Sequence, residues 1–399
     1  MTERLYYTDP YCTDFDATVV AIETAPPGRP DAIGVVLDRT AFYPTSGGQP
    51  FDVGTLGAAR VLDVIDRDDG RIVHVVDVHP GAAAVHGTVD WTRRFDHMQQ
   101  HTGQHVLSAA FDRLLQVRTV SFHLGAASAT IDLSREVSGA EIAQAEAEAN
   151  RVVWEDRAVT IRFADAADAA SLPLRKESKR EGILRIVDID GFDVSACGGT
   201  HVGRTGAIGI IAVAGSERFR AGTRLAFACG GRALTAYRGL RDAMAASVRL
   251  LSVLPADLPG AIERMQADAK AAKRDLKDLH AALAGYRAAE MTQHAETLGG
   301  ARVVIAAVDD ADANALKGMA AEIASRAGHA AILVSMPPPS AIVVARAADV
   351  AFDSGAVLTR LVALFGGKGG GKPELAQGGG LHGEIDAIRA AARLAISGA

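Results

Sequence analysis

The sequence predicts an α+β protein made of several domains, and three observations indicate this class. Short strand-like runs dominate the first quarter of the chain, and helical and strand-like segments alternate after it. A long helix with a heptad pattern then leads into a last stretch of buried-strand runs and helices. With 399 residues, 48% of them hydrophobic, the chain can bury more than one core. We predict a small antiparallel β-barrel, a mixed α/β domain, a long helical linker and a C-terminal α/β domain, at residues 1–90, 91–250, 251–299 and 300–399.

The barrel is predicted from alternating runs such as "ATVVAIETA", "DAIGVVLD" and "GRIVHVVDV", which glycine, proline and aspartate separate at regular intervals. Between two of these runs lies the segment "LDRTAFYPTSGGQPFDVGTL". In it, Gly47 and Gly48 allow a tight turn or a close approach of the backbone to another group.

The second part begins with the helical segment "FDHMQQHTGQHVLSAAFDRLL". Its predicted apolar stripe consists of Val106, Leu107, Ala110, Phe111 and Leu114. Another helix is expected after "VSGAE", where a serine followed three residues later by a glutamate forms a capping box. The strand-like pieces "AVTIRF", "ILRIVDI", "AIGIIAVAG" and "TRLAFAC" complete a mixed unit.

Residues 256–295 are predicted to form one long helix with an apolar heptad seam. Such a seam can pack on its own chain, as a hairpin or linker, or can join two copies as a homodimer, and the pattern leaves both open. The seam residues are Leu258, Ile262, Met265, Ala269, Ala272, Leu276, Leu279, Leu283 and Tyr286.

The last part combines the strand runs "ARVVIAAV", "HAAILVSM" and "AIVVARA" with helices. We expect "GGKGGGKPELAQGGG" to be a loop between helices, either a flexible tether or a phosphate-binding loop that uses free backbone N–H groups. Lys368 and Lys372 lie in it, but neither is followed by serine or threonine, so the segment is not a P-loop.

Charge and cysteine content narrow the class of protein further. The net charge of −6 gives no bulk signal for nucleic-acid binding, so any such surface must be local. The first residues do not have the layout of a signal peptide, and no apolar run approaches the roughly 20 residues that span a bilayer. Three cysteines, Cys12, Cys197 and Cys229, argue against a disulfide scaffold, so we expect a cytoplasmic protein.

Two pairs of metal-ligand residues stand far apart in the sequence. His101 and His105 are one helical turn apart and project from one helix face. In "VSACGGTHV", Cys197 and His201 flank two glycines that allow a tight turn. Together the pairs supply one thiolate and three imidazoles, a complete tetrahedral zinc set. The zinc would be either structural, with all four ligands bound, or open to water or substrate at one position.

The interpretation as a metalloprotease loses its general base at the residue after the first histidine. Thr102 stands where the His-Glu-x-x-His motif requires its glutamate general base.

"HTGQHVLSA" and "CGGTHV" resemble the editing domain of alanyl-tRNA synthetase. "LDRTAFYPTSGGQPFDVG" resembles the glycine-rich motif of the free-standing alanyl-tRNA editing proteins, the AlaX group, and "GGKGGGKPELAQGGG" resembles the C-terminal domain of the synthetase. No segment resembles the aminoacylation core. The order of these motifs is that of the long form of AlaX.

The resemblance implies hydrolysis of tRNA(Ala) mischarged with serine or glycine, at a zinc site made by His101, His105, Cys197 and His201. It places Gly47, Gly48 and Gln49 in substrate binding, Thr40 as the reader of the serine hydroxyl, and Gln104 where the synthetase has a threonine. A second hydrolytic site is useful because a pocket for alanine cannot fully reject such similar amino acids.

Basic clusters are the candidates for tRNA contact. They are Arg175, Lys176, Lys179 and Arg180; Arg218, Arg220 and Arg224; Arg93 and Arg94; and Lys368 with Lys372. Two alternatives to the editing function remain open: a zinc-dependent hydrolase of another small ester or amide, and a non-catalytic tRNA-binding protein with structural zinc.

Overall fold

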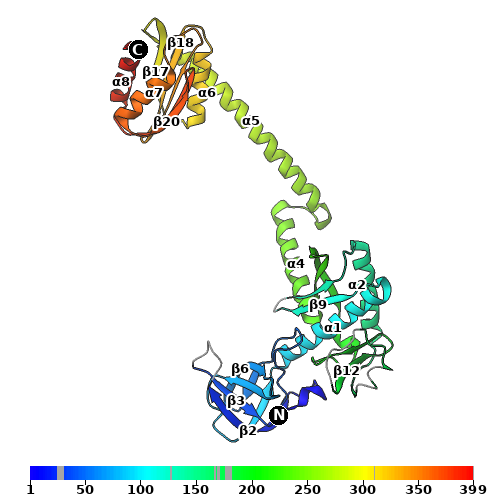
Figure 1. The fold of residues 1–399 in the computed structure, drawn as a ribbon. Coiled ribbons are helices and arrows are strands. Elements are labelled where there is room, and N and C mark those ends of the chain that lie inside the picture. Colours follow the sequence, from blue (N-terminus) through cyan, green and yellow to red (C-terminus); the bar gives the residue numbers. More distant parts are fainter. Residues whose placement is uncertain are drawn as a thin grey trace. The chain divides into compact units, whose positions relative to one another are not determined.

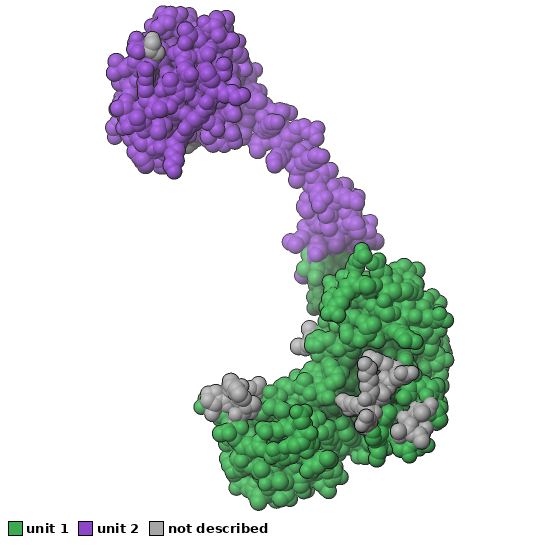
Figure 2. Space-filling view, in the orientation of Figure 1, with its two compact units in different colours: residues 1–246 green, residues 247–399 purple. Residues whose placement is uncertain are grey.

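The structure, a computed structural model, divides into two compact units, residues 1–246 and residues 247–399 (Figure 2). It describes residues 1–24, 31–125, 128–165, 168, 171–175, 182–309 and 311–398. Helices and sheets both contribute to each unit, so the predicted α+β class is confirmed (Figure 1). The four sequence-based boundaries remain predictions.

A closed six-stranded barrel forms the beginning of the first unit, as predicted. Its strand order is β2-β3-β7-β6-β5-β8, and every neighbouring pair is antiparallel. Burial alternates along β8, which is the pattern of a strand with one face inside the barrel. The barrel strands are β2 (Asp14–Thr24), β3 (Ile33–Leu37), β5 (Gly54–Leu56), β6 (Ala59–Asp66), β7 (Ile72–Val76) and β8 (Ala84–Val89).

Three short elements lie outside the barrel strands. β1 (Glu3–Arg4) pairs in parallel with β4 (Arg39–Thr40), and the 3-10 helix η1 (Leu5–Tyr7) follows β1. These pairings bring the start of the chain beside the glycine-rich segment that follows β4.

Helix α1 (Trp91–Leu115) is the centre of the rest of the first unit (Figure 1). It begins where the Asp90 side chain accepts a hydrogen bond from Arg93 N, and it ends at Gln116, which has a φ of 55°. Four of its five predicted stripe residues are buried, but Leu114 is 40% exposed, so that part of the prediction is wrong. The stripe turns away from the core in the last helical turn.

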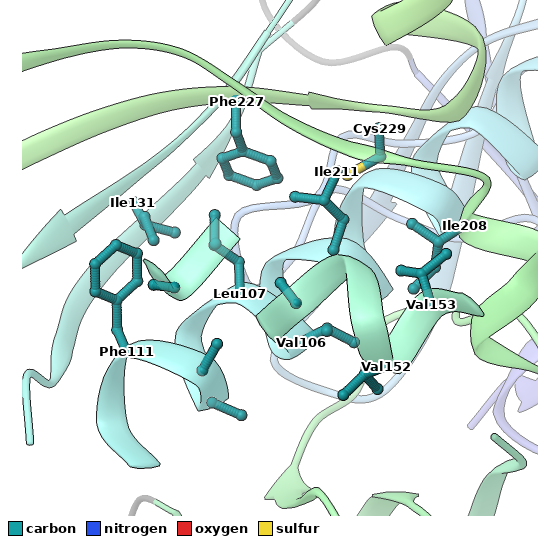
Figure 3. Close-up of a cluster of buried hydrophobic side chains, with 14 of the residues drawn as sticks. Val106, Leu107, Phe111, Ile131, Val152, Val153, Ile208, Ile211, Phe227 and Cys229 are labelled. Carbon is teal, nitrogen blue, oxygen red and sulfur yellow. The ribbon is translucent and has the colours of Figure 1, made fainter. Parts of the chain in front are cut away.

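The core around α1 is shared with α2 (Gly139–Trp154) and a four-stranded antiparallel sheet. Figure 3 shows Val106, Leu107 and Phe111 of α1 facing side chains from the sheet and from α2. The predicted capping box of α2 is confirmed, because Ser138 and Glu141 bond each other's backbone reciprocally. The sheet order is β14-β15-β10-β9, with β9 (Thr119–Leu124), β10 (Ala129–Leu133), β14 (Ile211–Phe219) and β15 (Gly222–Cys229).

A three-stranded antiparallel sheet completes the first unit. It consists of β11 (Val159–Ala164), β12 (Leu184–Ile189) and β13 (Asp193–Ala196), in that order. The 3-10 helix η2 (Thr205–Ile208) occupies the beginning of the predicted strand "AIGIIAVAG", so only its second half is a strand.

Helix α4 (Gly230–Leu251) was not predicted from the sequence. Its only buried residue is Ala233, whereas Leu234, Tyr237 and Leu240 are exposed. The spacing of three between these apolar residues was a helical signal in the sequence.

Helix α5 (Leu258–Gln293) confirms the predicted long helix, and the 3-10 helix η3 (Pro255–Asp257) precedes it. Only its last turns enter a core, where Ala288 packs with α6 and the C-terminal sheet. Most of the heptad seam is exposed, including Leu279 and Tyr286. The described residues therefore supply no partner for the seam, and the homodimer remains a prediction.

The C-terminal part is a six-stranded sheet with helices on both faces (Figure 1). Alternate residues of β18 pack toward α7 and α8 on one face and toward α5 and α6 on the other, which explains the continuous apolar run in the sequence. The sheet order is β16-β17-β18-β19-β21-β20, with β16 (Glu296–Leu298), β17 (Ala301–Asp309), β18 (His329–Met336), β19 (Ser340–Arg346), β20 (Lys368–Lys372) and β21 (Leu375–Leu381). The helices are α6 (Ala313–Ala324), α7 (Ser354–Phe365) and α8 (Ile385–Ser397).

The glycine-rich segment is not a loop, which corrects the sequence-based expectation. β20 and β21 form an antiparallel hairpin at the sheet edge. A Cβ on Gly371 would lie 2.3 Å from Ala376 Cα, so the two strands come close only because no side chain is present. Glycine has low strand propensity, and the pattern therefore concealed the strand.

Within the described residues, no single helix is both long and apolar enough to cross a membrane. Helix α4 and the segment Pro255–Gln293 meet that test of length and composition only together, as a bent pair.

A buried ion pair joins the barrel side of the first unit to α1. Arg94 and Asp52 are both fully buried, and Arg94 also donates to the backbone oxygens of Pro10 and Ala41. Asp52 accepts a further hydrogen bond from Tyr43 N at 2.7 Å. The pair thus fixes three separate segments against the start of α1.

We expect Arg94→Leu to lower the free energy of unfolding by about 3–5 kcal/mol, because Asp52 would keep a buried charge without its partner. Arg60→Leu is the matched control, since Arg60 pairs with Asp77 on the surface. Urea unfolding of the two variants measures the difference. Equal stability of both would contradict the assigned role of the buried pair.

Candidate metal centre and cavity

The four predicted metal ligands meet in one place. The ligand atoms of His101, His105, Cys197 and His201 all lie within 4.8 Å of one another. Cys197 Sγ is 3.4 Å from His101 Nε2 and 3.3 Å from His201 Nε2. Three of the four residues are buried, and Cys197 is half-buried.

Local structure explains how two distant segments converge. The helical spacing of His101 and His105 places both rings on one side of α1. After β13 the chain turns at Gly198 and Gly199 toward this side of the helix. A Cβ on Gly199 would lie 2.2 Å from His101 Cε1, so only glycine permits this approach.

Each histidine is held by its Nδ1 atom, which leaves Nε2 for a ligand. His101 Nδ1 lies 2.8 Å from Gln49 Oε1, and His105 Nδ1 lies 3.0 Å from Asp193 Oδ2. His201 Nδ1 lies 3.2 Å from Thr102 Oγ1.

The neighbours of these partners fix the proton positions. Gln49 Nε2 donates to Thr200 Oγ1, so Gln49 Oε1 must accept from His101. Thr102 donates its hydroxyl hydrogen to Met98 O, so it accepts from His201. The Asp193 carboxylate accepts from His105. All three Nε2 atoms are therefore free of hydrogen in the neutral tautomer, as metal binding requires.

A short polar chain supports His105. Asp193 Oδ1 accepts from Arg175 Nε at 2.7 Å, and Asp193 Oδ2 accepts from Ser195 Oγ at 2.9 Å. Burial opposes ionisation of Asp193, but His105 and Arg175 outweigh it and hold the pKa of this carboxyl below its usual range. Asp193 therefore stays a carboxylate at neutral pH.

The electrostatics of the cluster favour a cation at its centre. Burial would raise the pKa of the Cys197 thiol, but its contacts with the imidazoles of His101 and His201 lower this pKa well below its ordinary value. Burial would lower the pKa of His105, yet Asp193 and Cys197 raise it to about 9. Burial lowers the pKa of His201 to about 3. A thiolate and a nearby carboxylate thus stabilise one positive charge, which a divalent cation can supply in place of a proton.

The donor set fits zinc. One thiolate and three imidazoles, each imidazole oriented by a second hydrogen bond, form a tetrahedral ligand set of the type that zinc prefers. The residues named here would hold the ion through Cys197 Sγ and the three Nε2 atoms.

A cavity of about 470 Å³ adjoins this cluster. Gly47, His101, Gln104, His105 and Cys197 are among the residues that line it. The Gln104 side chain donates from Nε2 to Ser108 Oγ at 2.9 Å, which holds its carboxamide at the cavity wall. Two other residues of the wall, Arg175 and Ser195, belong to the chain that supports His105.

The glycine-rich motif acts in two ways. Gly47 and Gly48 have φ values of 55° and 86°, which glycine adopts without strain. A Cβ on Gly48 would lie 2.9 Å from Phe122 O, so the motif can approach β9. Gln49, which the resemblance placed in substrate binding, is fully buried and bonds His101 and Thr200.

The structure does not bring Thr40 to the cavity. Thr40 is fully buried beside the barrel, where its hydroxyl lies 2.7 Å from His74 Nε2 and accepts from Phe42 N. His74 Nδ1 lies 3.1 Å from Val35 O, so Nε2 accepts the hydroxyl hydrogen of Thr40. Because its hydroxyl hydrogen is donated to His74 and it does not line the cavity, Thr40 has no geometric support as the reader of serine.

Several basic candidates bond other residues of the protein, some of them on its surface. Arg175 supports Asp193, Arg94 is fully buried, and Arg224 pairs with Asp132. Arg218 pairs with Glu136. Lys176, Lys179 and Arg180 lie outside the described residues, and Lys368 and Lys372 are exposed on β20.

Sequence reasoning missed Asp193, Ser195 and Thr102. A signal for the first two was present, since Asp193, Ser195 and Cys197 alternate and therefore share one strand face. Thr102 had been considered only as the residue that replaces a glutamate.

The first unit thus combines a closed barrel with a Cys/His₃ cluster that could hold a metal ion and with an adjoining cavity. Residues 184–224 match the model of the threonyl and alanyl tRNA synthetase second additional domain. Residues 300–398 match the DHHA1 domain. These matches and the relatives below support the resemblance to the AlaX-like alanyl-tRNA editing proteins.

Curated relatives include the alanine--tRNA ligase of Pyrococcus abyssi, 32% identical over 94% of this chain and 42% of the relative. The alanine--tRNA ligase of Natronomonas pharaonis is 34% identical over 95% of this chain and 42% of its own length. The chain thus spans about two fifths of the length of these relatives. Among solved structures, the C-Ala domain of Aquifex aeolicus alanyl-tRNA synthetase is similar over 26% of this chain and 97% of that domain, at 18% identity, but the TM-score of 0.25 is too low to define a shared fold.

We expect the purified protein to carry about one zinc per chain, and His101→Ala and Cys197→Ala to abolish it. Gln49→Ala should weaken zinc binding by about 10- to 100-fold, because His101 would lose the bond that fixes its tautomer. Gln266→Ala, on the exposed side of α5, is the matched control. Metal analysis and competition with a chelator give the values. Unchanged zinc content in the two ligand variants would refute the site.

Thr40→Val should lower the free energy of unfolding by about 1–3 kcal/mol, because His74 Nε2 would lose its buried donor. The ratio of deacylation rates for serine- and alanine-charged tRNA(Ala) should not change. Thr55→Val, at an exposed position of β5, is the control for stability. A changed ratio with unchanged stability would restore Thr40 as the serine reader.

Proposed function

We propose that this protein hydrolyses the ester bond of tRNA(Ala) that carries serine or glycine in place of alanine, with zinc in the Cys/His₃ site. The observation that carries the proposal is the opening of this four-ligand cluster onto a cavity, in a chain related to alanyl-tRNA synthetases. The cavity volume of about 470 Å³ is within the range of small-ligand sites.

The residues of the cavity limit the chemistry. Among its described lining residues there is no aspartate or glutamate, and Asp193 behind the wall is committed to His105 and Arg175. Among the described residues of the cavity wall, no carboxylate is thus placed to act as a general base. An aminoacyl ester is reactive and needs little activation of water, so its hydrolysis does not require such a carboxylate. Bound zinc would act as a Lewis acid that orients the substrate or water.

Gln104 is the polar side chain best placed to position the amino acid. It lines the cavity, it precedes the ligand His105, and its Nε2 is held by Ser108. Its carboxamide can therefore offer a fixed hydrogen-bonding group to the serine hydroxyl or to the α-amino group. Alanine would leave such a group unpaired, which is how a hydrolytic sieve can spare the correct product.

Contact with tRNA is proposed for the C-terminal hairpin. Lys368 and Lys372 are exposed on the edge strand β20, and the segment belongs to the DHHA1 domain. An edge strand also leaves backbone N–H groups unpaired. Two lysines and these groups can bind phosphate oxygens.

In the test, the full-length protein is incubated with Ser-tRNA(Ala), Gly-tRNA(Ala), Ala-tRNA(Ala) and serine methyl ester. We expect release of serine and glycine at least about tenfold faster than release of alanine, a difference of about 1.4 kcal/mol, in the range of one hydrogen bond. Cys197→Ala should be inactive.

The other functions predict different results. Rapid hydrolysis of the methyl ester without preference for the tRNA esters would indicate a general zinc-dependent esterase. Binding of tRNA without release of any amino acid would indicate a non-catalytic protein. Either outcome would reject the proposal.

A further inference from the structure

One row of side chains leads from the cavity rim to the metal ligands. In the sheet β11-β12-β13, Phe163 lies directly opposite Arg185. The pairing of β12 with β13 ends at Ile186 and Ala196, and the hydrogen bond from Cys197 N to Arg185 O, at 3.0 Å, continues it by one residue, so Cys197 lies beside Arg185. Directly opposite residues share a sheet face, so Phe163, Arg185 and Cys197 stand side by side, and all three line the cavity. Two strand spacings, roughly 10 Å, separate Phe163 from the metal ligand.

The outer end of this row is apolar and exposed. Phe163 is 50% exposed, and the neighbouring wall residues Val120 and Ile183 are 58% and 73% exposed. Val120 lies in β9, Phe163 lies in β11, and Ile183 directly precedes β12. An apolar rim on a cavity marks a binding site for an apolar part of a ligand, and an exposed aromatic ring offers a stacking face.

The middle of the row is a buried cation with a free donor. Arg185 is 7% exposed, and it donates from Nε to Tyr7 O and from Nη1 to Cys197 O. Its Nη2 is buried and has no hydrogen-bond partner among the described residues. Within the same residues, no carboxylate forms an ion pair with it. The Nη2 nitrogen of this buried guanidinium therefore lacks an acceptor, and an anionic or oxygen-rich ligand would supply one.

We propose that this row is a nucleotide subsite, in which the terminal nucleobase of the tRNA stacks on Phe163 and an oxygen of the same nucleotide accepts a hydrogen bond from Arg185. The inference rests on the proposed function, since it names the residues that receive the nucleotide to which the amino acid is esterified. The order along the row matches the order along the substrate: base at the rim, sugar and phosphate oxygens in the middle, ester at the metal ligands.

Arg162 and Trp154 provide matched controls. Arg162 adjoins Phe163 in β11, so its side chain lies on the opposite sheet face, where it pairs with Asp188. Trp154, at the end of α2, is a 72% exposed aromatic residue that does not line the cavity. Variants of these residues therefore lose an arginine or an aromatic ring without changing the row.

The experiment measures the KM for Ser-tRNA(Ala) and the inhibition constant of AMP for full-length wild type, Phe163→Ala, Phe163→Trp and Trp154→Ala. We expect Phe163→Ala to raise both constants by about 5- to 150-fold, the range of one lost base–aromatic stack. Phe163→Trp should restore them, and Trp154→Ala should match the wild type. Arg185→Gln and Arg185→Lys should weaken AMP inhibition, whereas Arg162→Gln should not. Zinc content and the unfolding midpoint of each variant separate a lost contact from a disturbed fold.

The inference is wrong if Phe163→Ala leaves both constants unchanged, or if Trp154→Ala changes them equally. Direct binding of AMP, followed by calorimetry, tests the subsite without any turnover. Wild-type protein that binds AMP through Phe163 but releases no serine would retain the subsite and reject the deacylase function. Release of serine with no effect of Phe163→Ala would reject the subsite and retain the deacylase function.

Discussion

The site depends on the hydrogen bonds that the carboxamide of Gln49 makes. It accepts from His101 on α1 and from the backbone of Thr200, and it donates to the Thr200 hydroxyl. One side chain from the glycine-rich segment therefore connects both pairs of metal ligands. It orients His101 and also anchors the turn that carries Cys197 and His201. The metal centre would lose its geometry without this bond, although Gln49 is not itself a ligand.

The surrounding structure holds Gln49 in place. Gly47 and Gly48 take positive φ values immediately before it, and the buried pair of Asp52 and Arg94 fixes the segment just after it to α1. The barrel therefore has a definite role in the site, because its glycine-rich segment supplies the bond that orients the first ligand. A buried ion pair is costly to break, so the segment has one stable position.

Different elements of the first unit form the walls of the cavity around the four candidate metal ligands. Helix α1 provides two ligands and Gln104, whereas the three-stranded sheet provides Cys197 and the row that begins at Phe163. Asp193 lies behind the wall, where it accepts a hydrogen bond from His105. This carboxylate thus orients a candidate metal ligand, and the proposed hydrolysis would depend on groups that face the cavity.

The sequence by itself determined the α+β class, the barrel, the long helix and the two pairs of candidate metal ligands, because periodicity and ligand spacing are properties of neighbouring residues. The meeting of the two pairs was visible only in the tertiary structure. The sequence did not identify the hairpin β20-β21, since strands of glycine are recognised only by their pairing. The tertiary structure alone showed which groups Thr40, Gln49, Arg175 and Arg185 contact. Their side chains bond groups that lie far away in the chain, and such bonds depend on how the segments pack together rather than on any local pattern.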